Sequence, residues 1–147
     1  MLYRSLTFSW MLFSLVPAVS FAQNSPQPSV PAPPEIEQAL RARVTELFRL
    51  FVERDFRSAC ALVAEDARDY YLATPKGKVT FESFKITGVR FLNGDFTKAS
   101  VDLECTQKVQ AGERAGTVES VSIATLWKID DHRWMWYHEN DLSRPYL

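Results

Sequence analysis

Residues Val118 to Glu139 read VESVSIATLWKIDDHRWMWYHE and hold three of the four tryptophans of the chain. Two runs of alternating apolar residues flank Asp130-Asp131-His132, a pattern typical of two antiparallel strands joined by a tight turn. One face of the first strand is then formed by Val121, Ile123, Thr125, Trp127 and Ile129. The return strand has Trp134, Trp136 and His138 on one face and Met135, Tyr137 and Glu139 on the other. We predict that this hairpin forms the wall on which the domain is built.

Upstream of the hairpin, the apolar residues first follow a helical period. Apolar residues at three- and four-residue steps predict a helix over Glu35 to Arg54. They form one stripe along the predicted helix: Ile36, Leu40, Val44, Leu47, Phe48, Phe51 and Val52. Asp55 is placed to cap a second helix that ends near residues 65–67. Residues 68–72 are expected to run into a loop closed by Pro75-Lys76-Gly77.

From Lys78 onward the period of the apolar residues changes from helical to alternating. Within residues 79–92 the phase shifts by one residue, which predicts a β-bulge at Thr87-Gly88. Asn93-Gly94-Asp95 is a strong turn signal. The next strand is predicted to point Ala99, Val101, Leu103 and Cys105 inward and Lys98, Ser100, Asp102, Glu104 and Thr106 to solvent. Two helices followed by four strands predict an α+β fold, with the helices packed on a strongly curved four-stranded antiparallel sheet.

Composition limits the classes of partner. The 147 residues carry a net charge of −1, so no basic field exists to attract nucleic acid. The chain has no C-x-x-C motif and no paired histidines, so we predict neither a metal site nor a cofactor.

The first 22 residues resemble an export signal, with an apolar run that ends in Ser20-Phe21-Ala22 before Gln23. An uncleaved membrane anchor is the alternative. Residues 23–34 contain five prolines and predict a disordered linker. We therefore expect an exported protein, periplasmic or secreted, with no stable membrane anchor after cleavage. Its domain spans residues 35–140, and a tail spans 141–147.

Cys60 and Cys105 are the two cysteines of the chain. In an oxidising compartment they can form a disulfide. The alternative, which we favour, is two buried thiols that pack as small hydrophobic groups, because both lie among apolar neighbours.

Four segments together resemble the nuclear transport factor 2-like fold, also called the cystatin-like cone. They are Leu47-Phe48-x-x-Phe51, Glu53-Arg54-Asp55-Phe56, Leu62-Val63-Ala64-Glu65-Asp66 and the closing Leu126 to Trp134. Within that fold the chain is similar to small exported bacterial proteins without an assigned activity. The resemblance implies a cone-shaped domain that hosts isomerases, dehydratases and many non-catalytic modules.

An isomerase or lyase of the ketosteroid isomerase or dehydratase type needs a general base inside the cone. The catalytic candidates are Asp66, Tyr70 and His138, but each residue type at these positions is also typical of an ordinary structural role. No nucleophilic motif accompanies them. We keep this enzyme class as the alternative function.

A binding module needs only an apolar cavity with a few polar groups. Six aromatic residues are candidates for its lining: Tyr70, Tyr71, Phe84, Trp127, Trp134 and Trp136. The alternative is that these aromatic side chains simply fill a solid core. A third hypothesis is a homodimer formed through the second face of the hairpin, where Ala124, Leu126, Met135 and Tyr137 lie. We predict a non-catalytic binding or interaction module, with a small apolar ligand or a second copy as its partner.

Overall fold

The computed structural model describes residues 31–139, so the predicted signal peptide, most of the predicted linker and the predicted tail lie outside the described residues. The helical elements are α1 (Pro34–Val52), α2 (Phe56–Cys60), a short 3-10 helix η1 (Glu65–Ala67) and α3 (Arg68–Ala73). The strands are β1 (Val79–Phe91), β2 (Lys98–Val109), β3 (Val118–Asp130) and β4 (Arg133–Tyr137). They form one antiparallel sheet in the order β1-β2-β3-β4. The predicted α+β class with a four-stranded antiparallel sheet is confirmed.

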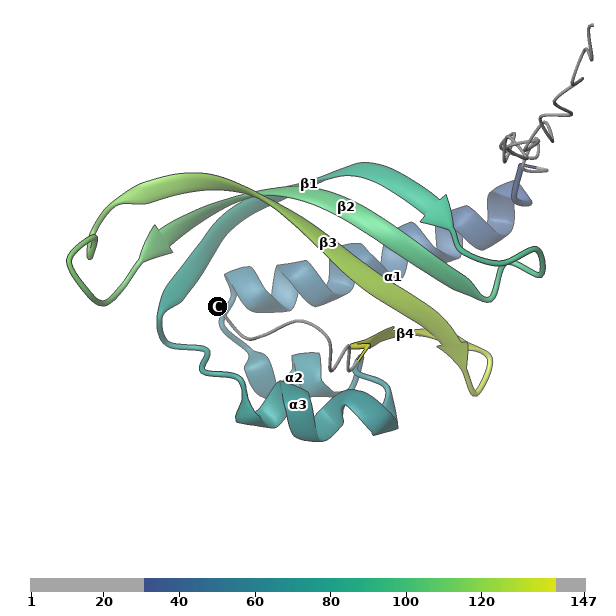
Figure 1. The fold of residues 1–147 in the computed structure, drawn as a ribbon, viewed down its shortest axis with the longest axis horizontal. Helices are drawn as coiled ribbons and strands as arrows, with labels where there is room; N and C mark the ends of the chain where they lie inside the picture. The colour runs from purple at the N-terminus through teal and green to yellow at the C-terminus, as the bar shows by residue number, and fades with distance from the viewer. Residues whose placement is uncertain (1–30, 140–147) are drawn as a thin grey trace, which may run out of the picture.

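Helix α1 lies under the sheet. The three long strands of the sheet, β1, β2 and β3, arch over this helix (Figure 1). Pro34 begins the helix, where its missing N–H costs nothing, and Glu35 and Glu37 face the positive end of the helix dipole. The residues that α1 buries are Leu40, Val44, Leu47, Phe48 and Leu50. Four of these belong to the predicted stripe, and Leu50 does not.

The connection from α1 to α2 is a tight reversal without glycine. Arg54 takes a left-handed conformation with φ of 62°, and the Asp55 N–H bonds the Leu50 carbonyl at 2.9 Å. The Asp55 carboxylate then accepts a hydrogen bond from the Ser58 N–H at 3.0 Å, as the predicted cap requires. Hydrogen bonding from Ser58 lowers the pKa of Asp55 below its ordinary value.

The concave face of the sheet forms the centre of the core. Ala99, Val101, Leu103 and Cys105 of β2 are at most 1% exposed, which confirms the predicted alternation. The register of β1 against β2 shifts between Ile86 and Gly88, where the bulge was predicted, and again between Phe81 and Ser83. Both irregularities lie in the edge strand, where they add to its bend.

The β3–β4 hairpin closes through a two-residue turn. Asp130 pairs with Arg133, and both intervening residues, Asp131 and His132, have positive φ values of 46° and 60°. This is the type I′ geometry whose twist matches that of the flanking strands. The predicted turn is therefore confirmed, although neither residue is glycine.

Two predictions for the segment between α1 and β1 are wrong. The second helix does not continue to residues 65–67. It ends at Cys60, because residues 62–64 instead follow the free edge of β4, with Val63 bridging Trp136 in parallel. The Trp136 N–H bonds the Leu62 carbonyl at 2.9 Å, and the Ala64 N–H bonds the Trp136 carbonyl at 2.8 Å. Residues 68–73 are helical rather than a loop, since a helix turns Tyr71 into the core.

Single positions of the sheet also differ from the prediction. Ser100, expected in solvent, is 4% exposed, and Ile129, on the inward face, is 38% exposed. Tyr137, on the face opposite Trp127, is only 6% exposed. Ile129 lies next to the hairpin turn at the end of β3, which leaves part of its side chain in solvent.

The convex face of the sheet is mostly polar. Lys98, Asp102 and Glu104 are exposed there, and Leu126 and Met135 are half-buried at its β3–β4 end. A homodimer through this face stays a prediction. Within residues 31–139, no helix is both long and apolar enough to span a membrane.

Candidate functional site

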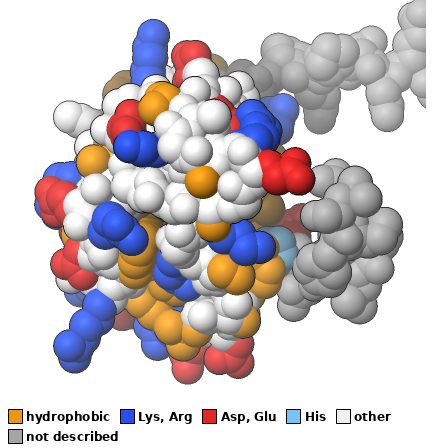
Figure 2. Space-filling view, turned by 90° about the vertical axis from the view of Figure 1, so that its left-hand side faces the viewer, with side chains coloured by type: hydrophobic (Ala, Val, Ile, Leu, Met, Phe, Trp, Pro, Cys, Tyr) orange, Lys and Arg blue, Asp and Glu red, His pale blue; other side chains and the backbone are white. Residues whose placement is uncertain are grey.

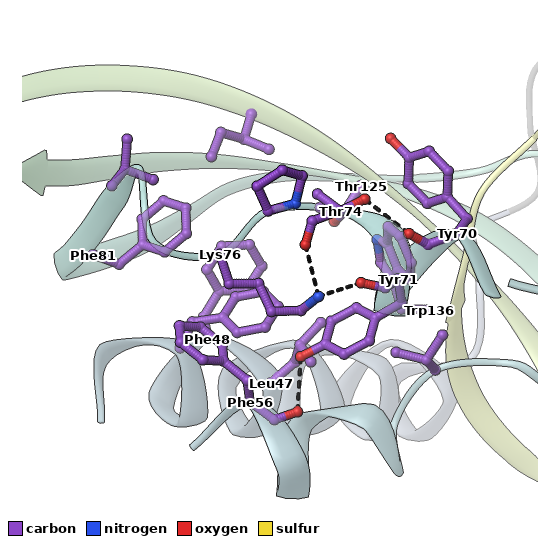
Figure 3. A pocket seen from close by; sticks show the side chains of 15 residues that line it. Leu47, Phe48, Phe56, Tyr70, Tyr71, Thr74, Lys76, Phe81, Thr125 and Trp136 are labelled. Atoms are coloured by element: carbon purple, nitrogen blue, oxygen red, sulfur yellow. Dashed lines mark hydrogen bonds between the residues drawn. The ribbon is translucent and has the colours of Figure 1, made fainter. Parts of the chain in front are cut away.

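A cavity of about 350 Å³ lies between the C-terminal half of α1, the α3–β1 connection and the concave face of the sheet. It is lined by Leu47, Phe48, Phe51, Phe56, Val63, Tyr70, Tyr71, Thr74, Pro75, Lys76, Val79, Phe81, Ile123, Thr125 and Trp136. Seven of these fifteen residues are aromatic (Figure 3). Thr74 and Pro75 are exposed, so the cavity reaches solvent at the α3–β1 connection.

Figure 2 shows the side of the molecule on which this connection lies. Hydrophobic side chains gather in the lower half of that face, and Lys and Arg side chains stand among them. Asp and Glu side chains also lie there, so this face combines apolar surface with charges of both signs.

Aromatic contacts hold the wall of the cavity in place. The ring of Phe51 stacks on Tyr71 with centroids 6.4 Å apart and on Phe81 at 6.0 Å. Phe48 meets Phe51 edge to face at 5.5 Å. Such aromatic pairs contribute more than their burial alone, so these contacts stabilise the wall.

The polar groups of the wall are few and mostly bonded. The Thr125 hydroxyl donates to the Val101 carbonyl at 3.1 Å and accepts from the Trp127 indole N–H at 2.9 Å. The Tyr71 hydroxyl donates to the Phe56 carbonyl at 2.9 Å. Burial raises the pKa of Tyr71 to about 12, with smaller contributions from Cys60 and Asp55 nearby. Tyr71 is therefore a neutral wall residue at physiological pH.

Three of the six aromatic residues predicted to bind a ligand lie on the cavity: Tyr70, Tyr71 and Trp136. The other three lie elsewhere in the core. Phe84 packs against Phe48 with centroids 5.6 Å apart. Trp127 is fully buried, and Trp134, 5% exposed, contacts Phe91.

The three catalytic candidates do not converge in the cavity. The Asp66 carboxylate bonds the Lys128 ammonium at 2.5 Å and is not a lining residue. The His138 ring stacks on Tyr70 with centroids 3.8 Å apart, and of these two only Tyr70 lines the cavity. Among the described residues, no Asp, Glu or His side chain lines the cavity, so its wall offers no general base of the isomerase type.

The sequence predicts most of the residues that line the cavity as core or loop residues rather than as ligand-binding residues. Phe48 and Phe51 were recognised as core residues of α1, and their spacing of three also marks the cavity wall. The sequence predicts Pro75 and Lys76 only as part of a loop closure, and it assigns no role to Thr74. No sequence signal identifies these three residues as part of the cavity wall, because their position depends on how α3 folds.

The chain matches no protein-family model, and a search of curated proteins finds no match either. Across the part of the chain that the structure describes, no group of three or more His, Cys, Asp or Glu residues is placed to hold a metal ion. The fold and the site thus define a small α+β domain with an apolar, aromatic-lined cavity.

Proposed function

We propose that this protein binds a small apolar molecule in the cavity between α1 and the sheet. The observation that carries the proposal is the cavity itself, about 350 Å³ in volume and lined by seven aromatic side chains. Ligand sites of proteins range over roughly 300–1,000 Å³ and combine an apolar wall with a few polar groups. A volume of this size at the lower end of that range suits a molecule of one to three rings or a short alkyl chain.

Physical chemistry favours an occupied cavity over an empty one. Protein interiors are close-packed, and a void of this size forfeits the dispersion contacts of its wall. Water is a poor occupant, because most of the wall offers no hydrogen-bonding group. An apolar ligand recovers those contacts and releases its own hydration water, so its binding is favourable.

We further propose that the domain adopts the nuclear transport factor 2-like cone and acts outside the cytoplasm. Helices ahead of a four-stranded antiparallel sheet support the first part, as does the sheet that arches over α1 (Figure 1). The apolar run that ends at Ala22 supports the second. Both parts agree with a carrier or sensor of small apolar molecules.

The first test is binding of N-phenyl-1-naphthylamine, a neutral probe whose fluorescence rises in apolar surroundings. The purified protein is expected to bind it saturably, with one site per chain. Ile123→Trp places an indole in the cavity, and we expect the probe affinity to fall about tenfold or more, since an occupied volume excludes a second ring.

Val121→Trp is the matched control, because Val121 lies on the same face of β3 but does not line the cavity. Its probe affinity is expected to stay within about twofold of the wild-type value. Equal loss in both variants, or no loss in Ile123→Trp, contradicts binding in this cavity.

A further inference from the structure

Lys76 is the only charged residue among the fifteen that line the cavity. It lies in the α3–β1 connection, next to the exposed Thr74 and Pro75, and is itself half-buried. In Figure 3 its ammonium group lies among the aromatic side chains of the wall. Among the described residues that line the cavity, the one charge is therefore positive, and it lies next to the exposed part of the α3–β1 connection.

No carboxylate neutralises this charge within the described range. Lys76 forms no ion pair with any Asp or Glu of residues 31–139, whereas five other basic residues of the range do. Its ammonium donates to the carbonyl oxygens of Tyr71 and Thr74, the latter at 2.9 Å. It also lies 4.1 Å from the centroid of the Tyr71 ring.

These contacts leave Lys76 able to bind an anion. An ammonium group has three donors, and the two carbonyls use two of them. The carbonyls and the ring hold the ammonium in one place without cancelling its charge. A positive group fixed in this way beside an apolar wall is complementary to an amphipathic anion.

We propose that the ligand is an apolar monocarboxylate, with its ring or alkyl chain in the cavity and its carboxylate on Lys76. This inference rests on the proposed function, because it specifies the class of molecule that the same cavity takes. The carboxylate accepts a hydrogen bond from the third ammonium N–H, and the rest of the ligand displaces water from the aromatic wall.

Lys76 also has a structural role, which the experiment must distinguish from a role in ligand binding. The carbonyls of Tyr71 and Thr74 belong to the C-terminal end of α3, where a lysine commonly satisfies unpaired carbonyl groups. A purely structural lysine stabilises α3, and its loss weakens all ligands alike. Only a lysine that binds the ligand creates a preference for an acid over its neutral analogue.

The experiment compares 1-naphthylacetate with 1-naphthylacetamide, which share ring and shape but differ in charge. Affinities are measured by isothermal titration calorimetry on the wild-type protein, Lys76→Met and Lys76→Arg. Lys78→Met is the matched control, since Lys78 is exposed and does not line the cavity. Thermal melts followed by circular dichroism report the effect of each substitution on folding.

We expect the wild-type protein and Lys78→Met to bind the acid about tenfold more tightly than the amide. Lys76→Met removes this preference and keeps the amide affinity within about twofold, and Lys76→Arg restores part of the preference. Equal affinity for the two ligands in the wild-type protein, or an unchanged preference in Lys76→Met, overturns the carboxylate inference alone. Binding of neither ligand, together with no binding of the neutral probe, overturns the proposed function as well.

Discussion

Replacing Trp127 by alanine is expected to lower the free energy of unfolding by about 4 kcal/mol. Trp127 is fully buried, lies between Ala99 and Trp136 in the sheet, and donates its indole N–H to Thr125 at 2.9 Å. The substitution leaves a void where β3 meets β4, and it removes the donor to a buried hydroxyl. Because small domains have a total stability of roughly 5–15 kcal/mol, this variant is expected to be close to unfolding at room temperature.

Urea denaturation followed by far-ultraviolet circular dichroism measures the effect. Ile129→Ala is the control, since Ile129 lies on the same face of the same strand but is 38% exposed. Its expected loss is about 1–2 kcal/mol, because more than a third of its surface is already in contact with water. Similar losses in the two variants contradict the assignment of Trp127 to the centre of the core.

Hydrophobic period alone placed most of the regular elements. The alternation of Ala99, Val101, Leu103 and Cys105 identified the inward face of β2, since successive side chains of a strand point to opposite faces. The phase shift before Gly88 identified a bulge. Gly88 suits that position, because a Cβ there lies 3.2 Å from the Asp102 carboxylate. Such local patterns are enough to predict the fold class without knowledge of any long-range contact.

The segment between the helices and the sheet was predicted poorly because tertiary contacts decide its structure. Val63 and Ala64 have a helical pattern in the sequence, but the unpaired edge of β4 offers them hydrogen bonds to the Trp136 backbone. Residues 68–73 show the opposite case. They form a helix where the sequence predicts none, and this helix buries the ring of Tyr71. In both cases a partner more than fifteen residues away overrides local preference.

The candidate site was predicted in part for the same reason. Tyr70, Tyr71 and Trp136 were identified by their aromatic character, which suits a cavity wall as well as a core. Trp127 has the same character and fills the core instead. The aromatic character of a residue thus makes it a candidate for the cavity wall. The path of α3 and of the α3–β1 connection decides which of these residues line the cavity. Lys76 enters the site only through that path.

Alkylation of Cys105 in the folded protein is expected to be more than about a hundredfold slower than alkylation of Cys60. Both thiols are free, as the interpretation without a disulfide predicted, but their surroundings differ. Cys60 is half-buried on α2, whereas Cys105 is fully buried on β2, and burial raises the pKa of Cys105 to about 11. At pH 8 the reactive thiolate of Cys105 is therefore rare and is also out of reach of the reagent.

Iodoacetamide labelling read by intact mass measures this difference. The folded protein is expected to take up one label quickly and a second only when urea unfolds it. Cys60→Ala leaves Cys105 as the single thiol and removes the fast phase, and Cys105→Val removes the slow one. A wild-type chain that takes no label even when unfolded has a disulfide, which contradicts the two free thiols.

The same burial makes stability depend on alkaline pH. The pKa of Cys105 is about 11 in the folded chain and is expected near its ordinary value of 9.0 in the unfolded chain. The unfolded chain therefore loses this proton first, so the stabilising contribution is complete below pH 9 and falls as the pH rises to 11. Two pKa units correspond to roughly 3 kcal/mol. We expect the wild-type protein to lose about that much more stability across this window than Cys105→Val, which keeps the apolar volume but has no proton to lose. Parallel pH profiles for the two proteins in urea denaturation contradict a buried thiol that stays protonated in the fold.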